Sequence, residues 1–236
     1  IKMIEVTIVI PNYNGEQFLD TCLSSLINNV SCKINIVVVD NGSTDKSKEI
    51  IANYPQVELI SLEQNFGFCK AVNIGIRNVH TPYLLLLNND VEIKTGFVEN
   101  LLERIQKEEN IFSVKPLMLQ FYHRDLVDSA GTFYNLLGWA QAGWKDKNYK
   151  NYLKARETFS TCGGASIYRR EIFDIIGYFD ENHFAYLEDV DIGYRARIYG
   201  YKNYYEPKAR VYHVGSGATG SRHNSFKVRV CARNNI

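Results

Sequence analysis

The acidic side chains of one short segment, residues 184–201, are the strongest candidates for chemistry in this chain. Glu188, Asp189 and Asp191 lie close together within FAYLEDVDIGYRARIYGY, and Arg195 follows the last of them by four residues. A carboxylate placed beside a substrate hydroxyl can accept its proton as a general base. Acids in the first turn of a helix also interact favourably with the helix dipole, so capping of a helix is the structural alternative.

Two further acids follow apolar runs that have the composition of buried strands. Asp40 follows INIVVV, residues 34–39, and Asp90 follows YLLLL, residues 83–87, after two asparagines. Open α/β sheets bind their ligands outside the carboxyl ends of the strands. We therefore expect both acids to lie at a ligand-binding edge of one sheet.

Each of these acids has a specific chemical use and a plain structural alternative. Asp40 could accept a hydrogen bond from the N3–H group of uracil or thymine, since a site built for that donor rejects bases that lack it. Its alternative is to cap a helix that begins near Ser43. Asp90 is the only carboxylate of the triplet Asn88-Asn89-Asp90. Divalent cations prefer oxygen ligands and bridge phosphates through one or two carboxylates. The structural alternative is a simple turn at the end of the strand, without a cation.

Small or polar residues also occur at other places where a substrate could bind. They lie in three segments, 12–15, 65–73 and 162–165, and at His213. Glycine allows the close approach of a ligand to the backbone, and a helix N-terminus favours phosphate. The small residues at 162–165 would leave room for a sugar. Ordinary turns and tight packing are the alternatives, and a lone histidine is more often structural than a ligand.

These side chains must be positioned by elements that alternate along the first half of the chain. The hydrophobic periodicity predicts strands at 6–10, 34–39, 57–61, 83–87 and 111–119, and helices near 18–27, 43–53, 67–78 and 97–105. Alternation of this kind implies a mostly parallel sheet with right-handed crossovers.

The periodicity weakens in the second half. Residues 120–158 are polar and aromatic, and we interpret them as a long excursion, one form of which is a hairpin over the carboxyl edge of the sheet. Regular patterns return with a strand at 160–170, helices at 169–176 and 188–199, and a strand near 203–212.

Composition excludes several classes of protein. The 236 residues suit one α/β domain, and 27 basic against 26 acidic residues give a net charge of +1, without a field for nucleic acid or for strong binding to anionic membranes. The five cysteines form no C-x-x-C pair, which argues against a zinc site or a disulfide framework and favours a cytoplasmic protein. No apolar run reaches transmembrane length, and the first residues lack the organisation of a signal peptide. Dinucleotide and P-loop motifs are also missing.

The order of the short motifs resembles a known family. The chain contains VTIVIPNYN (6–14), VVVDNGSTD (37–45), NFGFCKAVNIG (65–75), LLLLNND (84–90), FDENHFAYLEDVD (179–191) and VYHVGS (211–216). This series is similar to the motifs of family 2 glycosyltransferases, especially the branch of bacterial polysaccharide rhamnosyltransferases. The resemblance implies a single GT-A domain over residues 1–236, with a Rossmann-like, mostly parallel sheet and flanking helices. It divides the domain into a nucleotide-binding half (about 1–119), an acceptor and catalytic half (about 120–216, including the excursion), and a segment, 217–236, at which the family usually continues into further helices.

Residue chemistry and the resemblance together give a nucleotide- and substrate-binding set. The set comprises Pro11, Tyr13, Asn14, Asp40, Asn65, Gly67, Asn73, Asn88, Asn89, Gly163, Gly164 and Arg195. The resemblance further implies that Asp90 and His213 hold one divalent cation, Mn²⁺ or Mg²⁺, on the diphosphate. The family has an aspartate where this chain has Asn88, which weakens the case for Asn88 as a direct metal ligand and leaves its carbonyl free to contact ribose or metal-bound water. Arg222 and His223 could close over the diphosphate.

The resemblance implies inverting transfer of a sugar from dTDP-rhamnose or a UDP-sugar to a hydroxyl of a glycan or lipid-linked acceptor in cell-surface polysaccharide synthesis. Asp189 would take the acceptor proton, Glu188 and Asp191 would orient the site, and Arg195 would pair with one of them. The alternative is an inactive module that only binds nucleotide sugars. A nucleotidyltransferase would need a basic glycine-rich loop that residues 12–15 lack. We expect a cytoplasmic protein, with any membrane association at the inner face arising from residues beyond this chain, and the oligomeric state stays open.

Overall fold

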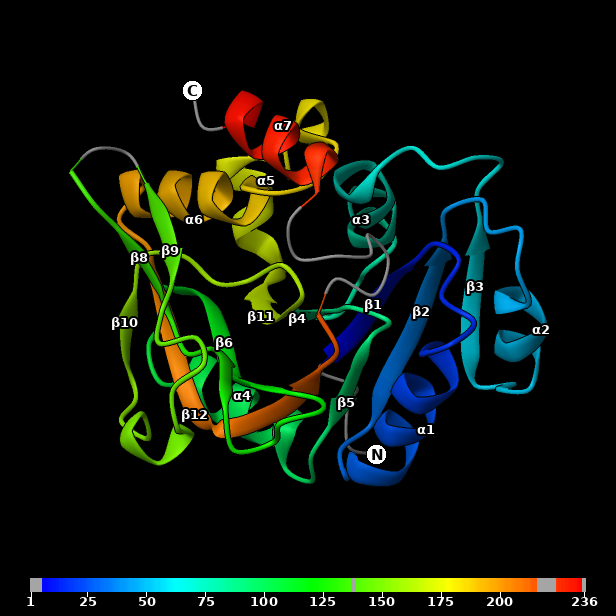
Figure 1. Ribbon diagram of the computed structural model, residues 1–236, viewed down its shortest axis with the longest axis horizontal. Coiled ribbons are helices and arrows are strands. Elements are labelled where there is room, and N and C mark those ends of the chain that lie inside the picture. Colours follow the sequence, from blue (N-terminus) through cyan, green and yellow to red (C-terminus); the bar gives the residue numbers. More distant parts are fainter. Residues whose placement is uncertain (1–5, 137–138, 216–223, 235–236) are drawn as a thin grey trace.

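The computed structural model describes residues 6–136, 139–215 and 224–234. Strands and helices alternate through the first half, from blue to green in Figure 1. The elements there are β1 (Val6–Asn12), α1 (Leu19–Asn29), β2 (Ile34–Asp40), α2 (Ser47–Ala52), β3 (Val57–Ser61), α3 (Phe68–Arg77), β4 (Tyr83–Leu87), β5 (Val91–Ile93), α4 (Phe97–Ile105) and β6 (Ile111–Gln120).

The second half begins with short strands and ends with longer elements. They are β7 (Val127–Ser129), β8 (Thr132–Tyr134), β9 (Ala140–Ala142), η1 (Tyr149–Asn151), β10 (Arg156–Thr158), β11 (Ala165–Arg169), η2 (Arg170–Ile172), α5 (Phe173–Ile176), η3 (Glu181–His183), α6 (Glu188–Ile198), β12 (Lys202–His213) and α7 (Ser225–Asn234).

One large sheet organises the molecule. Within the described ranges its path runs β10-β12-β6-β11-β4-β1-β2-β3, with β5 attached to β12 and β7 to β6. The strands β3, β2, β1 and β4 are parallel, as are β6 and β12, whereas β11 runs antiparallel between β4 and β6. The expectation of a mostly parallel α/β sheet is confirmed. The register pairs Asn12 with Asp40, so the carboxyl ends of β1 and β2 lie side by side.

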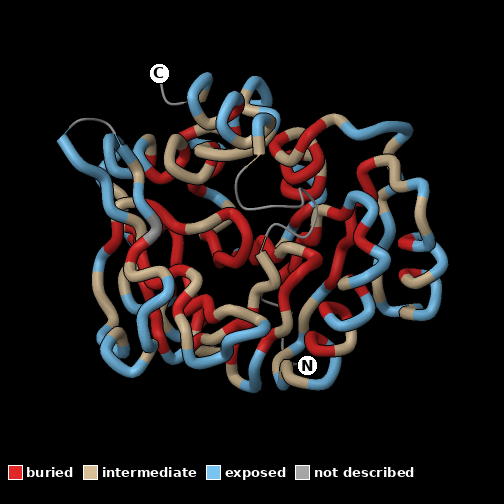
Figure 2. The backbone as a smooth tube through the Cα atoms, in the orientation of Figure 1, coloured by how far each residue is buried: buried red, intermediate tan, exposed pale blue. Residues whose placement is uncertain are grey.

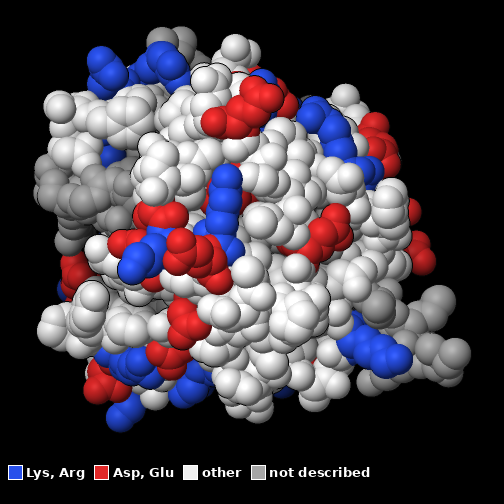
Figure 3. All heavy atoms as spheres, turned by 90° about the vertical axis from the view of Figure 1, so that its right-hand side faces the viewer, with Lys and Arg blue, Asp and Glu red and all other residues white. Residues whose placement is uncertain are grey.

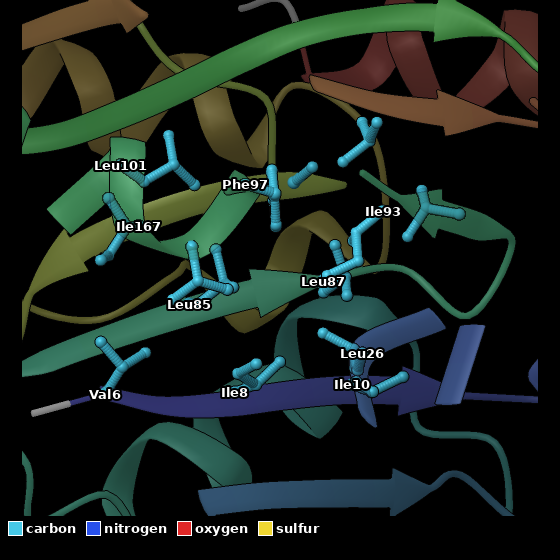
Figure 4. Close-up of a cluster of buried hydrophobic side chains, with 14 of the residues drawn as sticks. Val6, Ile8, Ile10, Leu26, Leu85, Leu87, Ile93, Phe97, Leu101 and Ile167 are labelled. Carbon is cyan, nitrogen blue, oxygen red and sulfur yellow. The ribbon is translucent and has the colours of Figure 1, made fainter. Parts of the chain in front are cut away.

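Helices cover both faces of the sheet and bury its apolar side chains. On one face, α1 and α4 pack against the strands, and Figure 4 shows Ile8, Leu85 and Leu87 meeting Leu26 and Phe97 there. On the other face, α3, α5 and α6 cover a second cluster. The buried residues follow the strands through the centre of the molecule (Figure 2). Full burial of each such side chain stabilises the fold by about 1.5–3 kcal/mol.

The differences from the sequence expectation lie in short elements. The strand expected at 160–170 begins only at Ala165, because residues 163 and 164 form a turn, and the helix expected at 169–176 begins as the 3₁₀ turn η2. The excursion at 120–158 contains β7 to β10, and β8 pairs with β9 as a hairpin. In the segment expected at 217–236, residues 217–223, with Arg222 and His223, lie outside the described residues, and α7 follows.

On the face shown in Figure 3, acidic and basic side chains gather in mixed groups that are separated by large uncharged areas. Within the residues that the structure describes, no helix combines the length and apolar character needed to cross a membrane.

The start of α3 depends on a glycine. Gly67 has φ +87°, and a Cβ there would lie 2.6 Å from the ring of Phe184 and 2.8 Å from its carbonyl oxygen. We expect Gly67→Ala to lower the free energy of unfolding by about 2–4 kcal/mol, measured by urea denaturation, because it adds a steric conflict to a strained φ. Gly200→Ala is the matched control, since Gly200 has φ +86° with nothing within 4 Å of its Cβ position. Equal losses in the two variants would contradict the role of Phe184.

Candidate active site

Polar side chains from three adjacent strands meet at the carboxyl edge of the sheet. The amide of Asn12, which is 1% exposed, donates a hydrogen bond to Asp40 Oδ1 (3.0 Å). Its oxygen accepts one from Asn89 Nδ2 (2.6 Å). The ends of β1, β2 and β4 are therefore tied together, and they form one wall of the candidate site (Figure 1).

Asp40 is fully buried in this wall. Its Oδ2 accepts the backbone N–H of Ser43 (3.2 Å) within a turn, and it does not cap a helix, because α2 begins only at Ser47. The ammonium of Lys48, on α2, lies 3.7 Å from the same oxygen. The side chain of Lys48 is 46% exposed, so it can move. A nucleobase could reach the Asp40 carboxylate only after Lys48 had moved aside.

The loop after β1 is braced against the loop after β2. Asn14 has φ 48°, its N–H donates to Ser43 Oγ (2.9 Å), and its Oδ1 accepts the N–H of Thr44 (2.9 Å). Tyr13 is 37% exposed and Pro11 is half-buried. Asn14 therefore fixes the loop that presents the Tyr13 ring to solvent.

The residues around the start of α3 also serve the protein. Asn65 Oδ1 accepts hydrogen bonds from Asn41 Nδ2 (3.0 Å) and from the N–H of Gly67 (2.9 Å). Asn73 is buried, and its amide donates to the carbonyl of Phe179 (2.8 Å) and accepts its N–H (3.1 Å). Asn73 thus joins α3 to the segment before the acids, while Asn65 shapes the turn into the helix.

The two predicted metal ligands lie next to each other. His213 Nε2 is 3.4 Å from Asp90 Oδ1, and both side chains are mostly buried. The other ring nitrogen, Nδ1, donates to Asp128 Oδ2 at 2.8 Å, and Asp128 Oδ1 also accepts from Lys145 Nζ at 2.6 Å. A carboxylate behind a histidine in this way holds the ring so that Nε2 faces a metal.

The protonation of this group is consistent with a cation position. Burial alone would lower the pKa of His213, but its hydrogen bonds to Asp128 and Asp90 and their charges outweigh this effect and raise the pKa to about 10. Burial would raise the pKa of Asp128, but its bonds to His213 and Lys145 hold it well below its usual range. Near neutral pH His213 therefore carries a positive charge between the carboxyl groups of Asp128 and Asp90.

The spacing also fits such an ion. Adjacent ligands of an octahedral ion with bonds of 2.0–2.1 Å lie about 3 Å apart, close to the 3.4 Å between Nε2 and Oδ1. Among the described residues, no group of three or more His, Cys, Asp or Glu side chains is arranged to hold a metal. The remaining ligands of an ion here would have to come from a substrate and water.

Backbone segments complete the space between the two groups of acids. The N–H of Asn88 donates to the carbonyl of Gly164 (2.8 Å), and a Cβ at Gly164 would lie 3.0 Å from the Asn88 amide. A Cβ at Gly163 would lie 3.2 Å from Glu188 Oε1. The small residues at 162–165 thus allow β4 to approach the start of β11, and they bring the backbone close to the acids.

Glu188 and Asp189 form a closely coupled pair at the start of α6. Burial, followed by the charge of Asp189, raises the pKa of Glu188 to about 8. Its Oε2 is buried and has no hydrogen-bond partner among the described residues. Burial also raises the pKa of Asp189, whereas the N–H of Gly163, 3.4 Å from Oδ2, and the buried ammonium of Lys115 favour its charged form. The two buried acids therefore hold a proton more tightly than an exposed glutamate and aspartate would.

The third acid is used differently. Asp191 pairs with Arg195 (2.7 Å), as expected, and the same guanidinium donates to the carbonyls of Ile176 (2.6 Å) and Tyr178 (2.8 Å). These contacts tie α6 to the end of α5. Within this structure Arg195 and Asp191 hold the helix that carries Asp189.

Sequence reasoning missed several residues of the site. Asp128, Lys145 and Lys115 were not singled out, and neither was Asn12 as the link between strands. An isolated acid or lysine in an irregular segment carries no local signal, and Lys115 sits in an otherwise apolar strand, where its charge was the only indication.

Comparison with known proteins agrees with this geometry. The family model described as Glycosyl transferase family 2 matches residues 7–177. The N-acetylglucosaminyl-diphospho-decaprenol L-rhamnosyltransferase of Mycobacterium tuberculosis is 27% identical over 237 residues, which cover 90% of this chain and 77% of that protein. The glycosyltransferase GlyA of Streptococcus pneumoniae is 33% identical over 134 residues, 53% of this chain and 19% of that protein.

Solved structures share the fold. GalNAc-T7, crystallised with UDP, GalNAc and Mn²⁺, gives a TM-score of 0.76 at 20% identity over 89% of this chain, which spans only 44% of the GalNAc-T7 chain. TarS 1–349 of S. aureus, solved with UDP, gives 0.65 at 18% identity over 98% of this chain and 70% of its own. These are GT-A folds. With the family model matched from the first strand to the end of α5, this chain belongs to family 2 of the glycosyltransferases, with the GT-A fold.

Proposed function

We propose that this glycosyltransferase carries out inverting, metal-dependent transfer of a sugar from dTDP-rhamnose or a UDP-sugar to a hydroxyl of a glycan or lipid-linked acceptor in cell-surface polysaccharide synthesis. The observation that carries the proposal is the pair of different acid groups beside one another on the sheet edge. One group is the buried pair of Glu188 and Asp189, whose pKa values are both raised, and the other, Asp90 with His213, has the spacing of a cation site. The relative that acts on a decaprenol-linked sugar supports a lipid-linked acceptor.

Asp189 is proposed as the general base. The acceptor hydroxyl gives up its proton as its oxygen attacks the anomeric carbon from the face opposite the leaving diphosphate, which inverts that carbon. Burial raises the pKa of Asp189 itself, which makes its carboxylate a stronger base than an exposed aspartate. Arg195 and Asp191 hold the helix in place behind them.

Asp90 and His213 are proposed to hold Mn²⁺ or Mg²⁺, with Asp128 orienting the histidine. The cation, when bound, offsets the negative charge that develops on the leaving diphosphate. The structures of GalNAc-T7 and of the mannosyltransferase PcManGT from Pyrobaculum calidifontis, both solved with Mn²⁺, support dependence on a divalent cation.

The nucleotide is proposed to bind along the ends of β1 and β2. Tyr13 offers an exposed ring for stacking, and Asp40 offers a carboxylate for the pyrimidine N3–H once Lys48 has moved aside. Asn65, Gly67, Asn88 and Asn89 surround the same edge, and Gly163 and Gly164 leave space for the sugar.

The base prediction compares two neighbouring acids. Asp189→Asn should lower the rate of transfer by about 10²- to 10⁴-fold with little change in the affinity for UDP or dTDP, because it removes basicity and keeps shape. Glu188→Gln is the matched control, since it makes the same change from carboxyl to amide in the acid next to the proposed base, and it should be much milder. Steady-state transfer assays and calorimetric titration of nucleotide give the two readouts. Near-normal turnover in folded Asp189→Asn would move the base to Glu188 or Asp191, and a wild-type chain that binds nucleotide without transfer would be the inactive binding module.

The metal prediction has its own readout. EDTA should abolish transfer, and Mn²⁺ or Mg²⁺ should restore it. Asp90→Ala and His213→Ala should each lose Mn²⁺ binding followed by electron paramagnetic resonance, and Asp128→Asn should weaken it by about 10- to 100-fold because the ring loses its orientation. The control is His80→Ala, at an exposed histidine before the start of β4, and this variant should bind Mn²⁺ normally. Full activity in EDTA would show that no cation is needed.

The nucleotide prediction concerns base selection. UDP and dTDP should bind better than GDP and ADP, and Asp40→Asn should reduce that preference, since the amide is a poorer acceptor for N3–H. Lys48→Ala, which removes the facing ammonium and most of its side chain but keeps the carboxylate, should keep the preference. Fluorescence or calorimetric titrations of the four nucleotides measure it. Equal affinity of the wild-type protein for guanine and uracil nucleotides would exclude base reading by Asp40.

A further inference from the structure

The segment that leads into the acid pair has an unusual backbone. Phe184, Tyr186 and Leu187 have φ of 39°, 67° and 66°, and none of them is glycine. Side chains with a Cβ rarely adopt such angles, and they persist only where the surrounding structure fixes them. Leu187 is the residue that precedes the first turn of α6, and its carbonyl accepts the N–H of Asp191 (3.0 Å). The direction of Glu188 and Asp189 therefore follows from this segment.

One side chain of α7 binds the whole segment through its backbone. Nδ2 of Asn234 donates to the carbonyls of Tyr186 (2.7 Å), Ala185 (3.0 Å) and His183 (3.3 Å). Arg233, next to it, donates to the carbonyl of Asn182 (2.8 Å). All four acceptors are main-chain oxygens, so these contacts recognise the conformation of the segment and not its side chains.

The segment is also held from the opposite side. The carbonyl of Phe184 accepts the N–H of Phe68 (2.6 Å), the first residue of α3, and its ring packs against Gly67. Phe226 of α7 meets the same ring edge to face, with centroids 6.2 Å apart. Figure 1 shows α7 along the upper edge, above α6 and near α3. The strained segment therefore lies between two helices that are more than 150 residues apart in the chain.

We propose that Asn234 is a positioning residue for the reaction: its amide fixes the left-handed segment 183–187 and so sets the direction from which Asp189 meets the acceptor hydroxyl. The proposal rests on the proposed function for the catalytic role of Asp189, but the contact that it describes does not. Because Asn234 touches neither donor nor acceptor in this arrangement, its loss should change the geometry of the base and leave the nucleotide end of the site intact.

Hydrogen exchange tests the contact independently of catalysis. In the full chain, Asn234→Ala and the isosteric Asn234→Asp, which has no N–H to donate, should raise amide exchange in residues 183–191 by about tenfold, the change expected for the loss of one or two hydrogen bonds. The matched control is Arg229→Ala, which removes an exposed cation from the same helix. In this variant, amide exchange in residues 183–191 should be unchanged. Unchanged protection in a folded Asn234→Asp would overturn the proposal even if Asn234→Ala failed to fold.

Kinetics then test the positioning role. In the Asn234 variants kcat should fall by about 10- to 100-fold, the scale of a misplacement of the order of 1 Å, with the KM for donor and the affinity for UDP within about twofold of the wild type. Arg229→Ala should keep kcat. A normal kcat in a variant with raised exchange would overturn the proposal. If Asp189→Asn retained turnover, the proposed function would fail instead, and the exchange result would still decide whether Asn234 holds the segment.

Discussion

The side-chain amide of Asn12 holds the carboxyl ends of β1, β2 and β4 together. It donates to the buried carboxylate of Asp40 and accepts from Asn89, so one amide with almost no exposure joins the carboxyl ends of three adjacent strands. A buried charge that loses its partner costs several kcal/mol, of the order of 3–5 for a broken pair. The second donor contact of Asn12, to Ser43 Oγ (3.2 Å), extends the link into the loop beyond β2. The loops proposed to bind the nucleotide begin at the strand ends that this amide connects.

The other half of the site depends on charge. Fully buried Lys115 donates to Ser129 Oγ (2.6 Å) and lies near enough to Asp189 and Asp128 for both charges to act on it. Burial lowers its pKa and the acids oppose that effect. Lys115 therefore lies within electrostatic reach of both acid groups, in a strand where burial disfavours its charged form. With little solvent to screen them, charges at these positions interact strongly.

The fold could be read from the sequence where the hydrophobic pattern was long. Runs such as INIVVV and YLLLL are too apolar for a solvent-facing strand, and they became β2 and β4 within a residue of their expected ends. The three-residue strands β5, β7, β8, β9 and β10 were beyond such reading, because three residues show no period. In the site, Asp90, His213, Asp189 and the pairing of Arg195 followed from motifs. Asp128 could not be predicted, since its contact with His213 joins residues 85 apart in the chain. The contact of Lys48 with buried Asp40 could not be predicted either, because it depends on a long side chain from the next helix.

The antiparallel strand β11 has a consequence for how the chain reaches this structure. The strands β1, β2 and β3 pair in chain order, and β4 returns to pair with β1 across 77 residues, so all four strands lie within the first 87 residues. β11 joins those strands to β6 and β12, and its partners in β4 are some eighty residues earlier in the chain. Closing loops of that length is slow, because their entropy is lost before any contact is gained. The strands that carry Asn12 and Asp40 therefore need no residue beyond Leu87 to pair with one another, whereas the proposed base, Asp189, follows β11 in the chain. During synthesis on the ribosome these strands would be complete before the proposed base has been made.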